Sequence, residues 1–309
     1  MLLYQRRDFG ALLEDTLNFF RKYGANYFKT FFILNGGVLL LLLLVIVLGF
    51  FDLFKHIFSG VGGDSSTFFV DDFAQNSTMY ILVGVMGFVL ILLLSLVMYA
   101  FPVLYMKRMG ETGGEPVSAT EMWQEIKKVI PHFFKFFFVL LVLMIPLFAI
   151  LIAVSAMLAL LLIGLVLILA LVPLFVNFIN LSWYDYLHRR GGLMQSFSFA
   201  ANAVRTNFWK YSASFWVVYL ILQVVTSIFT FVPMIIMTFS GFLVPNTEST
   251  GFQDSWLIFM AVIYIVSILV SFVLTNVLYI NAGLMYYDSR EDLHRGVVLE
   301  EIDNLGSNA

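Results

Sequence analysis

The amino-acid sequence predicts an all-α integral membrane protein with six transmembrane helices in three hairpins, each hairpin preceded by an amphipathic interfacial helix. Three observations predict this fold class: the composition, the lengths of the charge-free stretches, and a group of residues that occurs three times. Hydrophobic residues make up 61% of the 309 residues and charged residues only 12%, about half the charged fraction of ordinary soluble domains. A soluble fold could not bury so much apolar surface in one core.

The charge-free stretches give the number of spans. Those that lack Asp, Glu, Lys and Arg are 30–51, 73–106, 136–184, 211–247 and 255–287. A helix needs about 20 apolar residues to cross the hydrocarbon layer. As one helix, 136–184 would reach about 70 Å at 1.5 Å per residue, so it must fold back, near Leu158–Gly164, and give two spans. Each of the other stretches gives one, which makes six.

Basic residues test this count independently. Lys and Arg favour the cytoplasmic ends of membrane spans. With both termini inside, 16 of the 17 basic residues fall on the cytoplasmic side, and only Lys55 falls outside. A single span over 136–184 would reverse the later segments and destroy this asymmetry. The pattern therefore predicts a multi-pass protein with both termini in the cytoplasm.

A group of two aromatic residues followed by lysine occurs in "ANYFKTFF", "PHFFKFFF" and "TNFWKYSASFW", each time directly before an apolar run. Aromatic rings favour the membrane interface, and lysine extends its ammonium group toward the headgroups. The predicted interface anchors are Tyr27, Phe28, Lys29, Phe133, Phe134, Lys135, Phe208, Trp209 and Lys210. Plain anchoring explains them, and recognition of specific lipids or of a partner is the alternative.

An amphipathic helix is predicted before each group. Apolar residues recur 14, 7 and 4 positions before the first aromatic residue, a spacing that forms one face of a helix. The three faces consist of Leu13, Phe20 and Tyr23, then Ala119, Ile126 and Val129, then Met194, Ala201 and Val204. Ser118 and Glu121 fit a capping box at the start of the second helix. A helix with an apolar face and a basic edge can lie in the interface plane.

The organisation that follows is a single membrane domain over 1–309. Its repeated units span approximately 8–107, 118–186 and 192–288, and 289–309 forms a cytoplasmic tail that is partly disordered. The outer loop around 54–78 is predicted to be flexible because it is rich in Gly, Ser and Asp.

Candidate catalytic or metal-binding residues are few. Asp185 and His188 share one helical face, and Asp288, Glu291, Asp292 and His294 lie close together in the sequence. If they converged, they could form a metal or acid–base site. The favoured interpretation is a helix end with solvated charges, because no known catalytic or phosphate-binding motif is present. No catalytic residue, cofactor or metal is predicted.

Polar residues within the predicted spans permit a second interpretation. Asn177 and Asn180 lie one turn apart, and Asn276 lies in the last span. Hydrogen bonds between helices explain such residues adequately, and a polar substrate path is the alternative. The spans contain no ionisable Asp, Glu, Lys, Arg or His, although ion-coupled transporters usually need such groups.

At "GGLMQSFSFAANAVRTNFWKY" the chain resembles the membrane domain attached to some glycerophosphodiester phosphodiesterases, and related bacterial polytopic families. Their pattern is a small amphipathic helix followed by a spanning hairpin. The matching residues are Arg205, Asn207, Phe208 and Trp209, whereas the family's Ser falls on Ala200 and its Gly on Thr206. The overlap covers about 180–235. The phosphodiesterase barrel has no room here, so the resemblance implies a bacterial inner-membrane protein and no phosphodiesterase activity.

The function predicted from these observations is non-catalytic: a protein of the bacterial cytoplasmic membrane that organises lipid or serves as an accessory subunit of a membrane complex. Its expected partners are membrane lipids, especially anionic ones, and a membrane protein, but no nucleic acid. The alternative is a transporter or exporter of a lipid-like or small amphiphilic substrate, and a third possibility is an interfacial enzyme.

Overall fold

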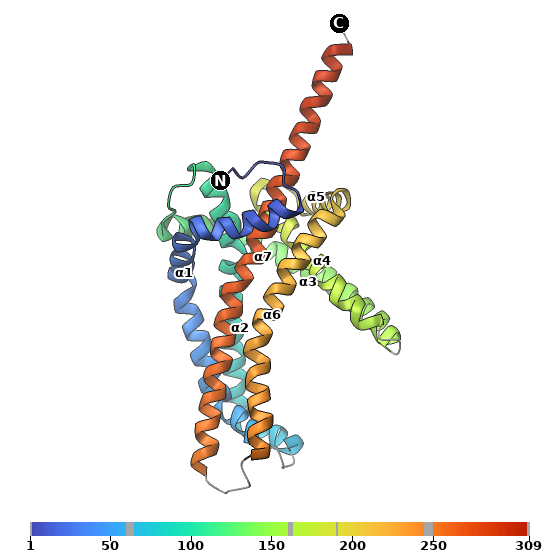
Figure 1. Ribbon diagram of the computed structural model, residues 1–309. Helices are drawn as coiled ribbons and strands as arrows, with labels where there is room; N and C mark the ends of the chain where they lie inside the picture. Colours follow the sequence, from blue (N-terminus) through green and yellow to red (C-terminus); the bar gives the residue numbers. More distant parts are fainter. Residues whose placement is uncertain (1, 60–64, 160–162, 190, 244–249, 308–309) are drawn as a thin grey trace. The chain divides into compact units, whose positions relative to one another are not determined.

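The structure is a computed structural model that describes residues 2–59, 65–159, 163–189, 191–243 and 250–307. Side chains are described in 2–47, 76–143, 171–189, 191–229 and 265–293, and at scattered positions between these ranges. Regular structure in the described residues is entirely helical (Figure 1). The helices are α1 (Phe9–Ser59), α2 (Ser65–Glu111), α3 (Ala119–Ala159), α4 (Ile163–Arg189), α5 (Leu193–Thr206), α6 (Phe208–Leu243) and α7 (Thr250–Ser307).

The all-helical, membrane-type architecture is confirmed. Among residues with described side chains, four stretches are long and apolar enough to cross a membrane: Phe9–Val47, Asn76–Glu111, Phe208–Phe229 and Ile265–Leu293. Much of the predicted third and fourth spans lies outside those residues, so the six-span count stays a prediction. The boundary between α3 and α4 falls at the predicted fold-back, and these two helices are in contact.

The three predicted corners between amphipathic helix and span differ. α1 and α3 run through theirs without a break, although α3 contains Pro131. Only the third corner separates two helices: Asn207, with φ −116° and ψ 39°, ends α5, and α6 begins at Phe208. The backbone N–H of Asn207 donates to the carbonyl of Ala203 at 3.1 Å, which satisfies an acceptor at the end of α5.

Two predicted irregular regions are largely helical. The region around 54–78 contains the end of α1 and the start of α2, with non-helical angles at Asn76. The predicted tail 289–309 continues α7 as far as Ser307. Extending an existing helix needs no new nucleus, so polar residues that would not start a helix can prolong one.

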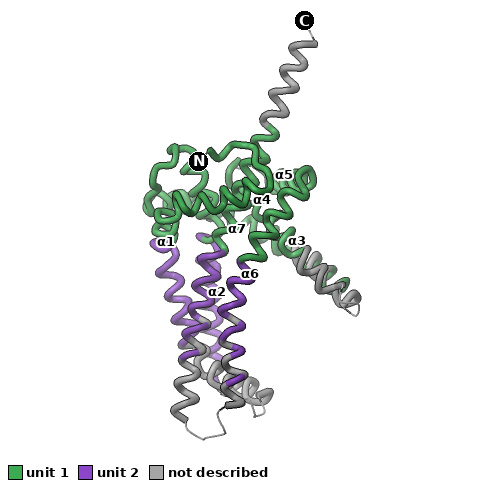
Figure 2. Tube along the Cα trace, in the orientation of Figure 1, with its two compact units in different colours: residues 1–31, 98–221, 275–309 green, residues 32–97, 222–274 purple. Residues whose placement is uncertain are grey.

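The chain divides into two compact units that cut across the sequence repeat (Figure 2). Unit 1 contains 1–31, 98–221 and 275–309, and unit 2 contains 32–97 and 222–274. Because α1, α2, α6 and α7 are long, each contributes residues to both units. Unit 2 consists of their most apolar segments, and unit 1 contains the polar clusters described below.

The core of unit 1 joins α1, α2, α4 and α7 through hydrogen-bonded aromatic residues. Tyr27 is fully buried, and its hydroxyl donates to Asn276 Oδ1 at 2.8 Å. The Tyr105 hydroxyl donates to Asn26 Oδ1, also at 2.8 Å. The Tyr184 hydroxyl donates to the carbonyl of Tyr279 at 2.8 Å. Polar atoms in an apolar interior need such partners, so these bonds fix which helices are neighbours.

The connection before α3 packs against α1. Gly113 and Gly114 have φ of 68° and 95°, in the left-handed region that favours glycine. The backbone N–H of Val117 donates to Asn26 Oδ1 at 3.2 Å. Ser118 Oγ accepts from the backbone N–H of Glu121 at 3.2 Å, which confirms Ser118 as the predicted helix cap.

Close packing at Gly283 provides a test of this core. A Cβ atom there would lie 2.5 Å from both Met106 Sδ and the Tyr184 hydroxyl. We expect Gly283→Ala to lower the free energy of unfolding by about 1–3 kcal/mol, since overpacking forces neighbours to move. Thermal unfolding in detergent would measure the loss. Gly37→Ala, where a Cβ atom meets nothing within 4 Å, is the control, and equal melting temperatures for the two variants would contradict the packing.

Candidate functional site

The strongest concentration of polar contacts lies around Asp288 in unit 1. We call Arg7, Lys210, Tyr211 and Asp288 the Asp288 cluster. Asp288 is fully buried. Its Oδ2 accepts from Lys210 Nζ and from the Tyr211 hydroxyl, both at 2.6 Å, and its Oδ1 accepts from the backbone N–H of Arg7 at 2.7 Å. The start of α6, the last part of α7 and the N-terminal segment (residues 2–8) therefore meet at one carboxylate.

The side chain of Arg7 organises the N-terminal segment. Its guanidinium is fully buried, and Nε donates to Asp15 Oδ2 at 2.8 Å. The other guanidinium nitrogens donate to the carbonyls of Leu2, Leu3 and Gln5 at 2.8–3.2 Å. The planar guanidinium offers five N–H donors in fixed directions, so one side chain holds several backbone groups of the segment together.

Two further ion pairs lie in the same unit. Arg6 Nε contacts Asp292 Oδ1 at 2.6 Å, and Arg290 pairs with Asp185. The Arg290 guanidinium also stacks 4.1 Å above the ring of Phe199. The prediction of solvated charges is wrong for Asp185, which is 2% exposed, and for Asp288, which is 0% exposed.

This pairing decides what the acidic residues can do. Asp185 and Asp288 each accept from a cationic side chain, so their charges are already compensated. Among residues with described side chains, no group of three or more His, Cys, Asp or Glu could hold a metal ion. The side chain of His294 lies outside those residues. The arrangement therefore suits the joining of chain segments, and among the described side chains it does not bring the candidate residues together as a metal site.

His188, at the end of α4, contacts the N-terminal segment. Its Nε2 lies 3.1 Å from the Tyr4 hydroxyl. Burial, with a smaller contribution from Lys107, lowers the pKa of His188 to about 4, against the opposing effect of Glu111. Burial also raises the pKa of Tyr4, and Arg290 opposes that shift. At neutral pH the imidazole is therefore uncharged, and its tautomer sets which of the two groups donates in this contact.

The predicted interface anchors do not form three equivalent groups. The first aromatic residue is buried in two of them: Tyr27 is 0% exposed and Phe133 is 4% exposed. The second aromatic residue faces outward in two groups: Phe134 is 48% exposed and Trp209 is 81% exposed. The second aromatic residue of the first group, Phe28, is half-buried, and the first aromatic residue of the third group, Phe208, is 41% exposed. Lys29 and Lys135 are exposed, whereas the ammonium group of Lys210 donates to Asp288.

The outward faces of α1 and α3 change from cationic to apolar at these anchors. On α1, exposed Lys29 is followed by Phe32 and Ile33, which are 40% and 61% exposed. On α3, exposed Lys135 is followed by Phe138, which is 68% exposed. Such a change is typical of a helix that passes from the headgroup region into hydrocarbon.

The residues of the predicted polar path are all buried but differ in their partners. Asn276 accepts from Tyr27. Asn177 is 0% exposed and neither its amide nitrogen nor its oxygen has a hydrogen-bond partner, and the amide nitrogen of 1% exposed Asn180 also has none. A spacing of four places Tyr184 on the same face as Asn180. That face of α4 looks toward α7, since Tyr184 bonds to Tyr279.

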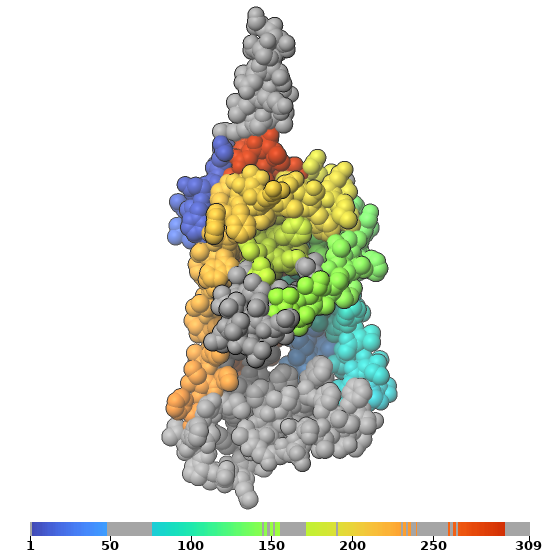
Figure 3. Space-filling model, turned by 90° about the vertical axis from the view of Figure 1, so that its right-hand side faces the viewer, coloured from blue at the N-terminus to red at the C-terminus, as the bar shows by residue number. Residues whose placement is uncertain are grey.

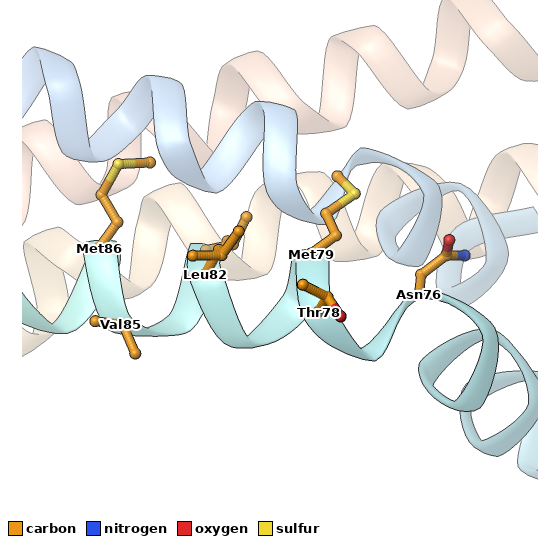
Figure 4. Close-up of a pocket in the computed structure, with 7 residues that line it drawn as sticks. Asn76, Thr78, Met79, Leu82, Val85 and Met86 are labelled. Carbon is orange, nitrogen blue, oxygen red and sulfur yellow. The ribbon is translucent and has the colours of Figure 1, made fainter.

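Unit 2 contains an open pocket along α2 (Figure 4). Its lining includes Asn76, Thr78, Leu82 and two methionines, Met79 and Met86, which point to the same side of the helix. Its described lining is mostly apolar, with Asn76 and Thr78 as the polar side chains.

The fold and these contacts define a class of protein: a helical membrane protein that has, among its described side chains, a buried network of ion pairs in unit 1. Comparison with known proteins adds no particular identity. No protein-family model matches the chain, and neither the curated proteins nor the solved structures gave a match.

The pair of Asp288 and Lys210 can be tested by a double-mutant cycle. We expect Asp288→Asn to lower the free energy of unfolding by about 3 kcal/mol, because it removes the counter-charge 2.6 Å from the half-buried Lys210 ammonium group and leaves Asp292, at 4.0 Å, in its place. Combined with Lys210→Met, the coupling energy should exceed about 1 kcal/mol. The control is the more exposed pair Glu125 and Lys128. The cycle of Glu125→Gln and Lys128→Met should give a coupling energy below about 0.5 kcal/mol. Similar coupling in both cycles would refute the assigned role.

The lowered pKa of His188 predicts a pH dependence of stability. The pKa of histidine is ordinarily 6.5, and that of His188 in the folded protein is about 4. Between these two pH values, the unfolded chain binds a proton at His188 that the folded chain does not bind. Stability should therefore fall as pH decreases through this window. Melting temperatures from pH 7 to 4.5 should fall less steeply for His188→Gln than for the unmodified protein. Parallel curves would show that His188 does not contribute.

Proposed function

We propose that the protein is a non-catalytic, lipid-organising protein of the bacterial cytoplasmic membrane, or an accessory subunit of a membrane complex. In this proposal the chain crosses the membrane six times, with both termini in the cytoplasm. The amphipathic part of each repeat lies at the inner leaflet. The resemblance of 180–235 to bacterial polytopic membrane domains supports the same placement.

The observation that carries the proposal is the contrast between the buried charges, which are paired within the protein, and the lysines that stay exposed. Buried carboxylates such as Asp185 and Asp288 are neutralised by cations within the protein. Lys29 and Lys135 remain exposed, directly beside outward apolar residues. These two lysines can therefore contact lipid headgroups. Each exposed cation adds about 1 kcal/mol of attraction to an anionic leaflet.

Native mass spectrometry of the intact protein tests lipid binding. We expect the protein to retain phospholipid, and Lys29→Gln with Lys135→Gln to weaken retention of phosphatidylglycerol about fivefold per cation. The same two residues changed to Arg keep the charge and should retain the lipid. Absence of retained phospholipid, or equal retention by the Gln and Arg variants, would contradict this function.

The unpartnered amides favour a second candidate function, a transporter or exporter of a lipid-like or small amphiphilic substrate. Buried amides without partners are costly in an apolar interior. A polar substrate or water along α4 would supply partners for Asn177 and Asn180.

The absence of cysteine from the chain allows a direct test of such a path. If it exists, Asn177→Cys and Asn180→Cys should react with a water-soluble thiol reagent in intact membranes. Leu171→Cys, at a position on α4 that is 37% exposed, is the control, because a lipid-facing thiol should stay unlabelled. Protection of both Asn positions would dismiss the path.

A further inference from the structure

The segment 189–210, which contains α5, differs in charge from the other two amphipathic segments. It carries Arg189, Arg190, Arg205 and Lys210 and no acidic residue. By contrast, 8–29 has three acidic and three basic residues, and 118–135 has two acidic and three basic residues. Among these segments, only the one around α5 is purely cationic.

The packing of α5 places its phenylalanines and small residues against the protein and leaves Met194 outside: the Phe197 ring lies 5.8 Å from that of Phe136, and the Phe199 ring lies 5.7 Å from that of Tyr286. Its buried residues are Ser196, Ala200 and Ala203, and α5 is in contact with α4. Met194 is 71% exposed, and Ala201, from the same predicted apolar face, is exposed as well. Of the predicted apolar face, Met194 and Ala201 therefore point away from the protein, and Val204 is half-buried. An outward apolar face is unfavourable in water but suits a lipid interface.

The outward face continues through the corner into α6. Trp209 is 81% exposed and Phe208 is 41% exposed, with ring centroids 5.3 Å apart. Arg189 and Arg205, near the two ends of α5, are exposed. Figure 3 shows α5 and the start of α6, in yellow and orange, at the surface of the molecule.

We propose that Arg189, Met194, Arg205, Phe208 and Trp209, which we call the α5 surface, form a docking site for anionic phospholipid. The proposal rests on the proposed function and deepens it, because it names one surface and the charge of its lipid. Met194, Phe208 and Trp209 enter the interface, and the two arginines bind phosphate groups. Guanidinium groups suit this role because they form paired hydrogen bonds to phosphate.

Charge complementarity identifies this occupant. A surface that combines exposed arginines and an exposed indole, without a carboxylate in its own segment, matches a negatively charged interface that is apolar on one side. The acidic residues nearest in the fold to Lys210 are already engaged: Asp288 binds Lys210 and Tyr211, and Asp292 contacts Arg6. Asp185, one turn before Arg189 on α4, is likewise engaged, because it pairs with Arg290.

Fluorescence quenching by brominated lipids in nanodiscs tests the α5 surface in the full chain. Brominated phosphatidylglycerol should quench more strongly than brominated phosphatidylcholine, and Trp209→Phe should remove this difference. Arg189→Gln with Arg205→Gln should raise the phosphatidylglycerol fraction needed for half-quenching about fivefold per cation. The control is Lys127→Gln with Lys128→Gln, which removes the same charge from exposed positions of α3 and should change that fraction less than twofold.

The outcomes separate this inference from the proposed function. Equal quenching of Trp209 by both lipids, or equal effects of the Arg pair and the Lys pair, would overturn the α5 surface while leaving lipid binding elsewhere intact. Lack of quenching by either lipid, together with the absence of retained phospholipid in mass spectrometry, would overturn both. If only an added membrane-protein partner shields Trp209, the surface binds protein and the lipid proposal is wrong.

Discussion

A buried carboxylate that directly follows the charge-free stretch of α7 is the constraint on which unit 1 depends. Asp288 has no exposed surface, and an isolated charge in such a place would be strongly unfavourable. An ammonium group, a phenol and a backbone N–H therefore have to reach it. Those donors come from α6 and from the N-terminal segment, so neutralising one charge fixes the relative positions of three parts of the chain.

The N-terminal segment is held by the same principle. The Arg7 side chain is buried, and this is tolerable because Asp15 and three backbone carbonyls accept its N–H groups. Arg6 and Tyr4 add contacts to Asp292 and His188. A short stretch with little apolar surface is thus ordered by charge-assisted hydrogen bonds, which are stronger than neutral ones.

A membrane also changes what an apolar face means. On α3, Ile126 and Val129 of the predicted face are buried, as they would be in a soluble protein. On α5, Met194 and Ala201 of the predicted face are exposed, and Ser196, Ala200 and Ala203 pack inside. Small residues allow helices to approach closely, and lipid can cover the larger ones. Periodicity therefore identifies an amphipathic helix without telling which environment its apolar side meets.

The sequence by itself determined the helical membrane class, because long charge-free stretches and a low charged fraction are properties of composition. It also located the boundary between α3 and α4, since a helix has a fixed rise per residue. Only the tertiary structure decided the partners of Asp185, Asp288 and Lys210. Those partners lie 77 or more residues away, and local spacing carries no information about such distant pairs. The same limit explains why Lys210, which resembles Lys29 and Lys135 in its local sequence, turns inward to an ion pair while the other two stay exposed.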